Sequence, residues 1–219
     1  MTTSSAVAPL RAVREGNAAK RAAILAAARE LFVLDGVERT SMDAIAARAG
    51  VSKRTVYDYY GDKRRLLIEV IVAAGESLLE TLRTAVADHL SDDADIPDLA
   101  SLEAALTRFA VQVGESMLTT SDYAATFRLI AENGAALEEL ADHPLAQAPE
   151  EAVAERLAHF ARRGLLDVPD PRLAADHFNA LTTLLATNGR YPARVDDGEI
   201  RTVLTEGVRA FVRAYAHRG

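Results

Sequence analysis

Residues 41–60 read SMDAIAARAGVSKRTVYDYY, and this stretch decides the fold. Ser41 can cap a helix, because its hydroxyl can accept from the free amides of a first helical turn. Ala46 is small enough to let two helices cross closely, and Gly50, four residues later, permits a turn with positive φ. The spacing is typical of a helix-turn-helix, and it predicts helices over 42–49 and 53–60.

The second of these helices carries hydrogen-bond donors on its exposed positions. Lys, Arg, Ser and Thr at the start of a recognition helix meet base edges and phosphates in the major groove. The exposed positions are Ser52, Lys53, Arg54, Thr55, Tyr57 and Asp58. Thr40-Ser41 and Asp62-Lys63 each open a helix, so both pairs add backbone amides that can hold a phosphate.

The same residues also fit an ordinary helical hairpin in which Gly50 only ends a helix. The charge pattern helps to distinguish this hairpin from a DNA-binding helix-turn-helix. The whole chain has a net charge of −7, which by itself argues against nucleic acid as a partner. Residues 11–65, however, hold 12 Lys and Arg against 7 Asp and Glu, whereas residues 66–219 hold 13 against 25. This segregation favours DNA as the partner of the N-terminal part.

Helix breakers and hydrophobic periodicity predict an all-α fold. No stretch alternates apolar and polar residues at a period of two, and no proline occurs between Pro9 and Pro97. The polar, acidic segment 91–98 is expected to be a loop. Beyond the motif, helices are predicted at 17–34, 63–90, 99–119, 122–138, 146–164, 171–188 and 198–216.

Several classes of protein are excluded by what the sequence lacks. Without cysteine there is no disulfide scaffold, thiolate metal site or cysteine nucleophile. No apolar run approaches the length of a membrane-spanning helix. The five histidines are scattered, and no phosphate loop, dinucleotide fingerprint or serine nucleophile elbow occurs. No metal, no cofactor and no enzymatic activity are therefore expected.

The N-terminal segment resembles the TetR-type transcriptional regulators over about residues 17–67. The residues that carry the resemblance are Ile24-Leu25, Ala27-Ala28, Leu31-Phe32, Gly36, Thr40-Ser41, Ile45-Ala46, the run Ala49 to Ser52, the run Thr55 to Tyr60, Asp62-Lys63 and Leu66-Leu67.

The resemblance implies two domains and a set of DNA contacts. A disordered basic arm over 1–16 would precede a three-helix DNA-binding domain over 17–65. A larger helical domain over 66–219 would bind an effector and dimerise. Base readers are expected at Lys53, Arg54 and Thr55, and phosphate contacts at Thr40, Tyr57, Tyr59 and Lys63.

Two positions depart from the family pattern. Tyr60 stands where a Phe is usual, and its ring is expected to pack against the first helix with its hydroxyl at the edge. Arg64-Arg65 follow Lys63 where a Glu often stands, and they could either contact phosphate or pair with acids.

The C-terminal part, over about 122–216, resembles the AefR-like type. The resemblance implies a four-helix dimer interface built from 171–188 and 198–216, although the same apolar stripe could pack only within one monomer. Its residues are Leu173, Phe178, Leu181, Leu184, Leu185, Val203, Leu204, Val208, Phe211, Val212 and Tyr215.

An effector pocket is expected among the middle helices, for an apolar or amphipathic ligand. Plain core packing is the other interpretation of every residue proposed to line it. The candidates are Phe109, Val113, Met117, Tyr123, Phe127, Phe178 and Leu181.

These observations favour a cytoplasmic, homodimeric repressor that a small effector releases from a palindromic DNA operator. An activator, or a regulator controlled by a protein partner without a small ligand, is the alternative. A helical enzyme with a basic N-terminal module would need convergent titratable groups, which the sequence does not offer.

Overall fold

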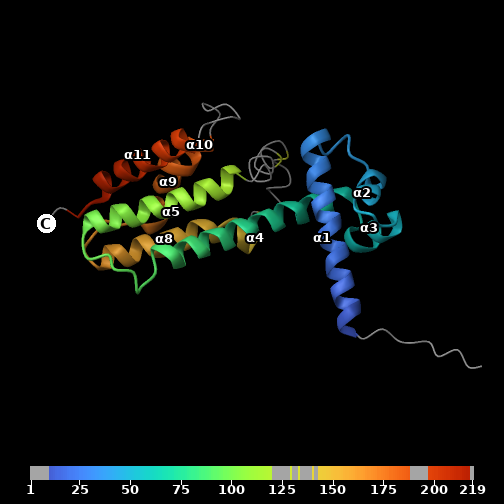
Figure 1. Ribbon diagram of the computed structural model, residues 1–219, viewed down its shortest axis with the longest axis horizontal. Coiled ribbons are helices and arrows are strands. Elements are labelled where there is room, and N and C mark those ends of the chain that lie inside the picture. The colour runs from blue at the N-terminus through green and yellow to red at the C-terminus, as the bar shows by residue number, and fades with distance from the viewer. Residues whose placement is uncertain are drawn as a thin grey trace, which may run out of the picture. The chain divides into compact units, whose positions relative to one another are not determined.

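The protein is helical throughout the part of the chain that its structure describes (Figure 1). The computed structural model describes residues 10–119, 129, 133, 140, 143–187 and 197–217. No β-strand forms within these ranges, and an isolated antiparallel bridge joins Leu166 to Ala216. The predicted all-α fold class is confirmed.

The chain divides into two compact units. The first, here called the helix-turn-helix unit, comprises residues 1–73 and 125–140, and the second, the bundle unit, comprises 74–124 and 141–219. The sequence analysis placed the boundary at 65/66, at the start of a long helix. The division instead falls after Ala73, within that helix.

The helix-turn-helix unit begins with α1 (Leu10–Asp35), which starts earlier than predicted. Residues 10–16 are helical, not part of a disordered arm. The sequence explains the difference, since Leu, Arg, Ala and Glu are good helix formers and no proline interrupts them. Once the packed part of α1 has formed, each added residue contributes a hydrogen bond without a new nucleation cost.

The remaining helices of this unit are α2 (Met42–Arg48), α3 (Lys53–Tyr60) and the first part of α4 (Lys63–His89). Their shared core contains Ile24, Phe32, Ile45, Val56 and Leu66, each with at most 1 % of its surface exposed.

Two leucines from far along the chain are buried in the same core. Leu129 is 2 % exposed and Leu140 is 9 % exposed, and both belong to the cluster of the helix-turn-helix unit. The sequence analysis had assigned them to the C-terminal domain. Sequence distance gives no sign of this packing, because an apolar helical stripe does not identify its partner.

The bundle unit consists of long helices around one apolar core. It contains the rest of α4, α5 (Leu99–Thr119), α8 (Ala148–Arg162), α9 (Pro171–Asn179) and α11 (Asp197–Tyr215). Helix α5 packs against α11, and α8 packs against α9 (Figure 1). The core includes the fully buried side chains Leu102, Leu106, Phe160, Leu204 and Phe211.

The segment predicted as a helix over 171–188 is helical over 171–187, with a π turn inside it. Helix α9 gives way to a π-helical turn, η2 (Ala180–Leu184), before α10 (Leu185–Thr187). The hydroxyl of Thr182 donates to the Phe178 carbonyl at 2.6 Å, the acceptor that an α-helix would give to the Thr182 amide. The predicted helix over 122–138 lies outside the described residues, except for Leu129 and Asn133.

Candidate nucleic-acid interface

The two helices of the motif are both capped by serine. Ser41 Oγ accepts from the Ala44 amide at 3.1 Å, as predicted, and Ser52 Oγ accepts from the Thr55 amide at 3.1 Å. Gly50 between them has a φ of +66°, a conformation that favours glycine. These local features fix the start of α3, which is the part that a recognition helix presents to DNA.

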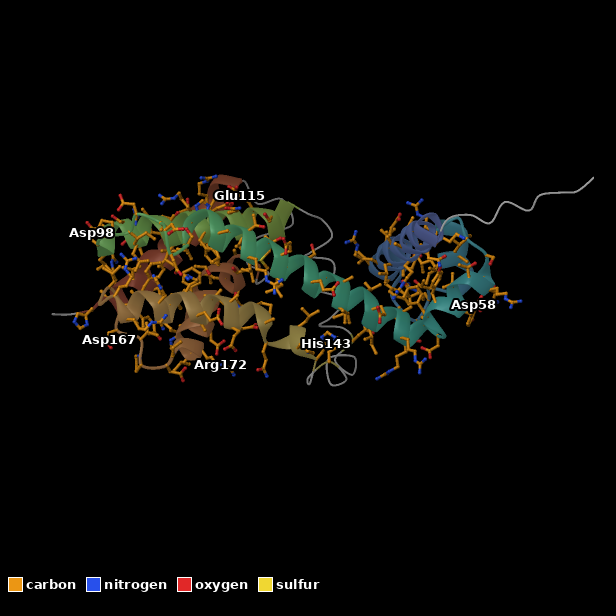
Figure 2. All side chains as sticks on the ribbon, turned by 90° about the horizontal axis from the view of Figure 1, so that it is seen from below. Asp58, Asp98, Glu115, His143, Asp167 and Arg172 are labelled. Carbon is orange, nitrogen blue, oxygen red and sulfur yellow. The ribbon has the colours of Figure 1, made fainter. Side chains whose placement is uncertain are left out.

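The exposed surface of α3 contains most of the residues predicted to contact bases. Ser52, Lys53 and Arg54 are exposed at its start, and Tyr57 is 43 % exposed one turn later. Asp58 lies on the same exposed surface (Figure 2). Thr55 is only half-buried, and its hydroxyl shares a 2.7 Å hydrogen bond with Ser52 Oγ.

Both cations of α3 have an acidic partner nearby. Lys53 Nζ lies 2.8 Å from a carboxylate oxygen of Asp43 on α2, and Arg54 Nε lies 3.6 Å from Asp58. The hydrogen bond to Asp43 raises the pKa of Lys53, so its ammonium stays charged. The sequence analysis predicted neither of these ion pairs. The pair of Arg54 and Asp58 could have been predicted, because the two residues are four apart on one helix. No such spacing indicates that Asp43 is the partner of Lys53.

Helix α2 is fastened to α1 by a second ion pair. The Arg48 guanidinium donates to both carboxylate oxygens of Glu30, at 2.9 and 2.7 Å. This hydrogen bonding lowers the pKa of Glu30 and raises that of Arg48. The pair is exposed, so its role is geometric more than energetic.

Thr40 was predicted to contact phosphate, but its side chain points into the protein. It is 4 % exposed, and its hydroxyl donates to the carbonyls of Leu31 at 3.1 Å and Gly36 at 2.8 Å. The residue closes the turn between α1 and α2. The sequence pattern could not distinguish this role from a phosphate contact, because a hydroxyl at a helix start suits both.

Lys63, also predicted to contact phosphate, is engaged in the same turn. Its ammonium donates to the carbonyls of Val37 at 2.7 Å, Glu38 at 3.0 Å and Thr40 at 3.1 Å. An ammonium group has three hydrogens, so all its donors are used within the protein.

The tyrosines at the end of α3 are largely structural. Tyr60 is 4 % exposed, and its hydroxyl donates to the Arg21 carbonyl at 3.3 Å, which confirms the predicted packing against the first helix. Burial raises the pKa of Tyr60. Tyr59 is half-buried against the same core, with its ring 6.3 Å from that of Tyr60.

Most of the predicted effector-pocket residues lie in the core of the bundle unit. Phe109, Val113, Met117 and Phe178 are each at most 7 % exposed, and Leu181 packs partly buried against them. The rings of Phe109 and Phe178 lie 6.1 Å apart. Tyr123 and Phe127 lie outside the described residues.

Elsewhere in the bundle unit, the described residues line two open hollows. One, of about 670 Å³, lies along α5 and α11, and the other, of about 660 Å³, lies along α4 and α8. Neither is lined by a predicted pocket residue. In the described ranges, no cluster of His, Asp and Glu could hold a metal ion. No helix of that part of the chain is long and apolar enough to cross a membrane.

The sequence of the chain matches two protein families, one after the other. Residues 24–70 match the bacterial regulatory proteins of the TetR family. Residues 104–217 match the C-terminal domain of AefR-like transcriptional repressors.

Individual proteins add detail to these matches. The flavonoid-responsive regulator FrrA is 30 % identical, with 91 % of this chain and 98 % of that chain covered and a TM-score of 0.63. A TetR-family regulator from Mesorhizobium loti has the same fold at 24 % identity, with 91 % and 98 % covered and a TM-score of 0.78. The transcriptional activator FasR of Mycolicibacterium smegmatis is 37 % identical over 67 residues, which is 31 % of either chain, so the match spans about a third of that relative.

The exposed, capped helix α3 lies within residues 24–70, the segment that matches the TetR family. TetR-family proteins are DNA-binding transcription factors and not enzymes, as the sequence analysis expected for this chain. The chain belongs to the TetR family of transcriptional regulators.

Proposed function

We propose that the protein is a homodimeric repressor that reads a palindromic operator with α3. The observation that carries the proposal is the exposed start of α3, where Lys53 and Arg54 stand on a helix held by the Ser52 cap. Lys and Arg at that position reach guanine edges in the major groove. The similarity of residues 104–217 to AefR-like repressors favours repression.

The proposed DNA contacts follow the exposure of each side chain. Lys53 and Arg54 are the base readers, and Ser52 and Tyr57 contact phosphate beside them. Thr55 and Tyr59, both half-buried, contribute at the edge of the surface. Ser41, which is exposed before α2, is a further proposed contact to DNA.

The homodimer is proposed to form through α9, η2 and α10. Leu173, Leu184 and Leu185 are 49 %, 39 % and 45 % exposed, so they leave apolar surface uncovered on this segment. Five other residues of the predicted stripe are instead buried within the unit's own core, namely Phe178, Leu204, Val208, Phe211 and Val212. Two recognition helices must sit ~34–36 Å apart to read successive major grooves, which a dimer provides.

The effector is proposed to be a small apolar or amphipathic molecule. FrrA, which covers most of this chain, is described as responsive to flavonoids. Helix α4 continues from the helix-turn-helix unit into the bundle unit, so it can carry a ligand-driven movement. Release then requires that the ligand prefer the conformation that misfits the operator.

Selection of bound duplexes from a random DNA pool tests the proposal directly. The expected result is a palindrome whose base preference changes in Lys53→Ala and Arg54→Ala variants. A flavonoid added to the complex should weaken binding to the selected duplex. A pool that yields no preferred sequence, or variants that select the wild-type sequence, would contradict the assignment.

Activation of transcription is the second candidate, favoured by the 67-residue similarity to FasR. Transcription in vitro from a promoter that contains the selected palindrome separates the two. A repressor lowers the transcript yield when it is added, whereas an activator raises it.

A further inference from the structure

Lys63 occupies a position that is unusual for a residue expected to hold DNA. It opens α4, yet its ammonium faces the turn between α1 and α2. The three carbonyls that accept its hydrogen bonds, those of Val37, Glu38 and Thr40, all belong to that turn. A charged donor makes each of these bonds stronger than a bond between neutral groups.

Thr40 also forms hydrogen bonds within the turn between α1 and α2. Its hydroxyl bonds to the Leu31 and Gly36 carbonyls, and its amide donates to Gly36 at 3.2 Å. The end of α1, the turn and the start of α4 are therefore joined by hydrogen bonds to the main chain. We call Thr40, Lys63 and the carbonyls they contact the carbonyl joint.

The carbonyl joint is next in the chain to the helices that carry the proposed DNA contacts. Ser41, the next residue after Thr40, is the cap of α2, and α2 in turn carries Asp43, which holds Lys53 of α3. A change in the turn would therefore displace α2 and the groups that place Lys53.

We propose that Lys63 is a positioning residue for DNA recognition and does not contact phosphate. The carbonyl joint fixes the orientation of α2 and α3 relative to α4. This orientation is needed for base readout. This inference rests on the proposed function, since it concerns how the same surface is held.

The test compares two lysines of the same chain by the same substitution. Lys63→Met and Lys53→Met are each measured against the duplex selected by the wild-type protein and against a random duplex, over a range of salt concentrations. Loss of a phosphate or base contact made by a cation lowers the salt slope by about one, for any contacted sequence. Loss of position lowers only the specific affinity.

For Lys63→Met we expect about a ten-fold or greater loss of affinity for the selected duplex, with the affinity for random DNA and its salt slope unchanged. The factor corresponds to roughly one charge-assisted hydrogen bond. Lys53→Met should lower the salt slope. If Lys63→Met weakens both duplexes alike and lowers the slope, Lys63 contacts phosphate and the proposal fails. If Lys63→Met is folded and binds both duplexes like the wild type, its role is structural only and the proposal also fails.

Thr40→Val and Thr40→Ser keep the proposal testable if Lys63→Met does not fold. Valine removes the hydroxyl from the carbonyl joint without changing charge, and serine retains it. The valine variant should lose specific affinity at an unchanged salt slope, and the serine variant should not. Unchanged binding by a folded valine variant would overturn the proposal.

Hydrogen exchange gives a measurement that needs no DNA. In Lys63→Met, amides of residues 36–41 should exchange faster than in the wild type, because the turn has lost three bonds. Wild-type exchange rates in that variant would contradict the carbonyl joint. A wild-type protein that selects no duplex would count against the proposed function, and this exchange result would remain valid on its own.

Discussion

The helix-turn-helix unit and the bundle unit are held together by different interactions. In the first, the two short helices α2 and α3 pack on an apolar core and are oriented by polar side chains bonded to main-chain groups, as at Ser41, Thr40, Lys63 and Tyr60. In the second, long helices such as α5, with 21 residues, are fixed by close apolar packing.

Helix length explains the contrast. Helix α2 has seven residues and buries Met42, Ile45 and Ala46, and α3 has eight and buries Val56 and Tyr60. So little apolar area cannot fix the orientation of a helix by itself, because burial is not directional. Hydrogen bonds supply the direction, and caps satisfy the amides of the short helices. The comparison therefore predicts that steric changes harm the bundle unit most, and polar changes the helix-turn-helix unit.

The largest effect is expected from Gly207→Ala in the bundle unit. A β-carbon there would lie 2.0 Å from the Leu181 carbonyl oxygen, a main-chain atom that cannot move aside cheaply. Overpacking of this kind should lower the free energy of unfolding by about 3 kcal/mol, measured by urea denaturation. Gly16→Ala in α1 is the control, since nothing lies within 4 Å of that position. Equal stability of Gly207→Ala and wild type would show that packing in the bundle is looser than described.

A smaller effect is expected from Ser41→Ala in the helix-turn-helix unit. The substitution removes the acceptor of the Ala44 amide, and loss of such a cap costs about 1 kcal/mol. Thermal unfolding followed by circular dichroism measures the loss. Ser41→Asp, which restores an acceptor at the cap, should recover most of it, and a failure to recover would mean that the cap is not what stabilises α2.

Asp43→Asn should strengthen binding to DNA of any sequence by about two- to five-fold, the range of an exposed ion pair. The carboxylate of Asp43 competes with DNA for Lys53, so neutralising the carboxylate frees the ammonium. Fluorescence anisotropy with a random duplex measures the change. Asp88→Asn in the bundle unit, whose carboxylate accepts from Gln112, is the control and should leave DNA affinity unaltered.

The smallest effect concerns acid stability. The hydrogen bond from Arg48 lowers the pKa of Glu30 below its ordinary value of 4.5. Between the two pKa values the unfolded chain binds more protons, so the pair stabilises the folded unit above pH 4.5 and stops doing so as the pH falls through the lowered pKa. At low salt, the free energy of unfolding of Glu30→Gln should therefore fall less steeply than that of the wild type as the pH is lowered.

An ion pair of the bundle unit can be tested in the same way, by the dependence of the free energy of unfolding on pH. The hydrogen bond from Arg156 lowers the pKa of Asp92, so Asp92→Asn should flatten the acid limb in the same direction. An unchanged acid limb in both variants would show that neither exposed pair contributes to stability.

Sequence was most informative where a residue's role is decided by its near neighbours. The Ser41 cap, the positive φ at Gly50 and the burial of Tyr60 all depend on residues within the motif or on the helix beside it, and these predictions were confirmed. Thr40 and Lys63 were read as phosphate contacts, because their spacing fits both a contact and a joint. Only the folded turn shows which carbonyls lie within their reach.

In the bundle unit, periodicity identified the helices but not their partners. The burial of Leu129 in the core of the helix-turn-helix unit, and the approach of Gly207 to Leu181, depend on three-dimensional neighbours that no short pattern encodes. The π turn around Thr182, inside the predicted helix, was likewise not predicted.

That π turn has a consequence for how this helical segment tolerates a change of length. A π turn holds one residue more than the α-helical turn it replaces, so it acts like a one-residue insertion between α9 and α10. Because the extra residue is taken up inside the turn, loss of one residue from 180–183 would leave an α-helical turn, and the residues after it would keep their direction. In a regular α-helix, the same loss would rotate every following residue by about 100° around the helix axis. The turn is thus a place where the segment can shorten while Leu185 stays on the exposed surface.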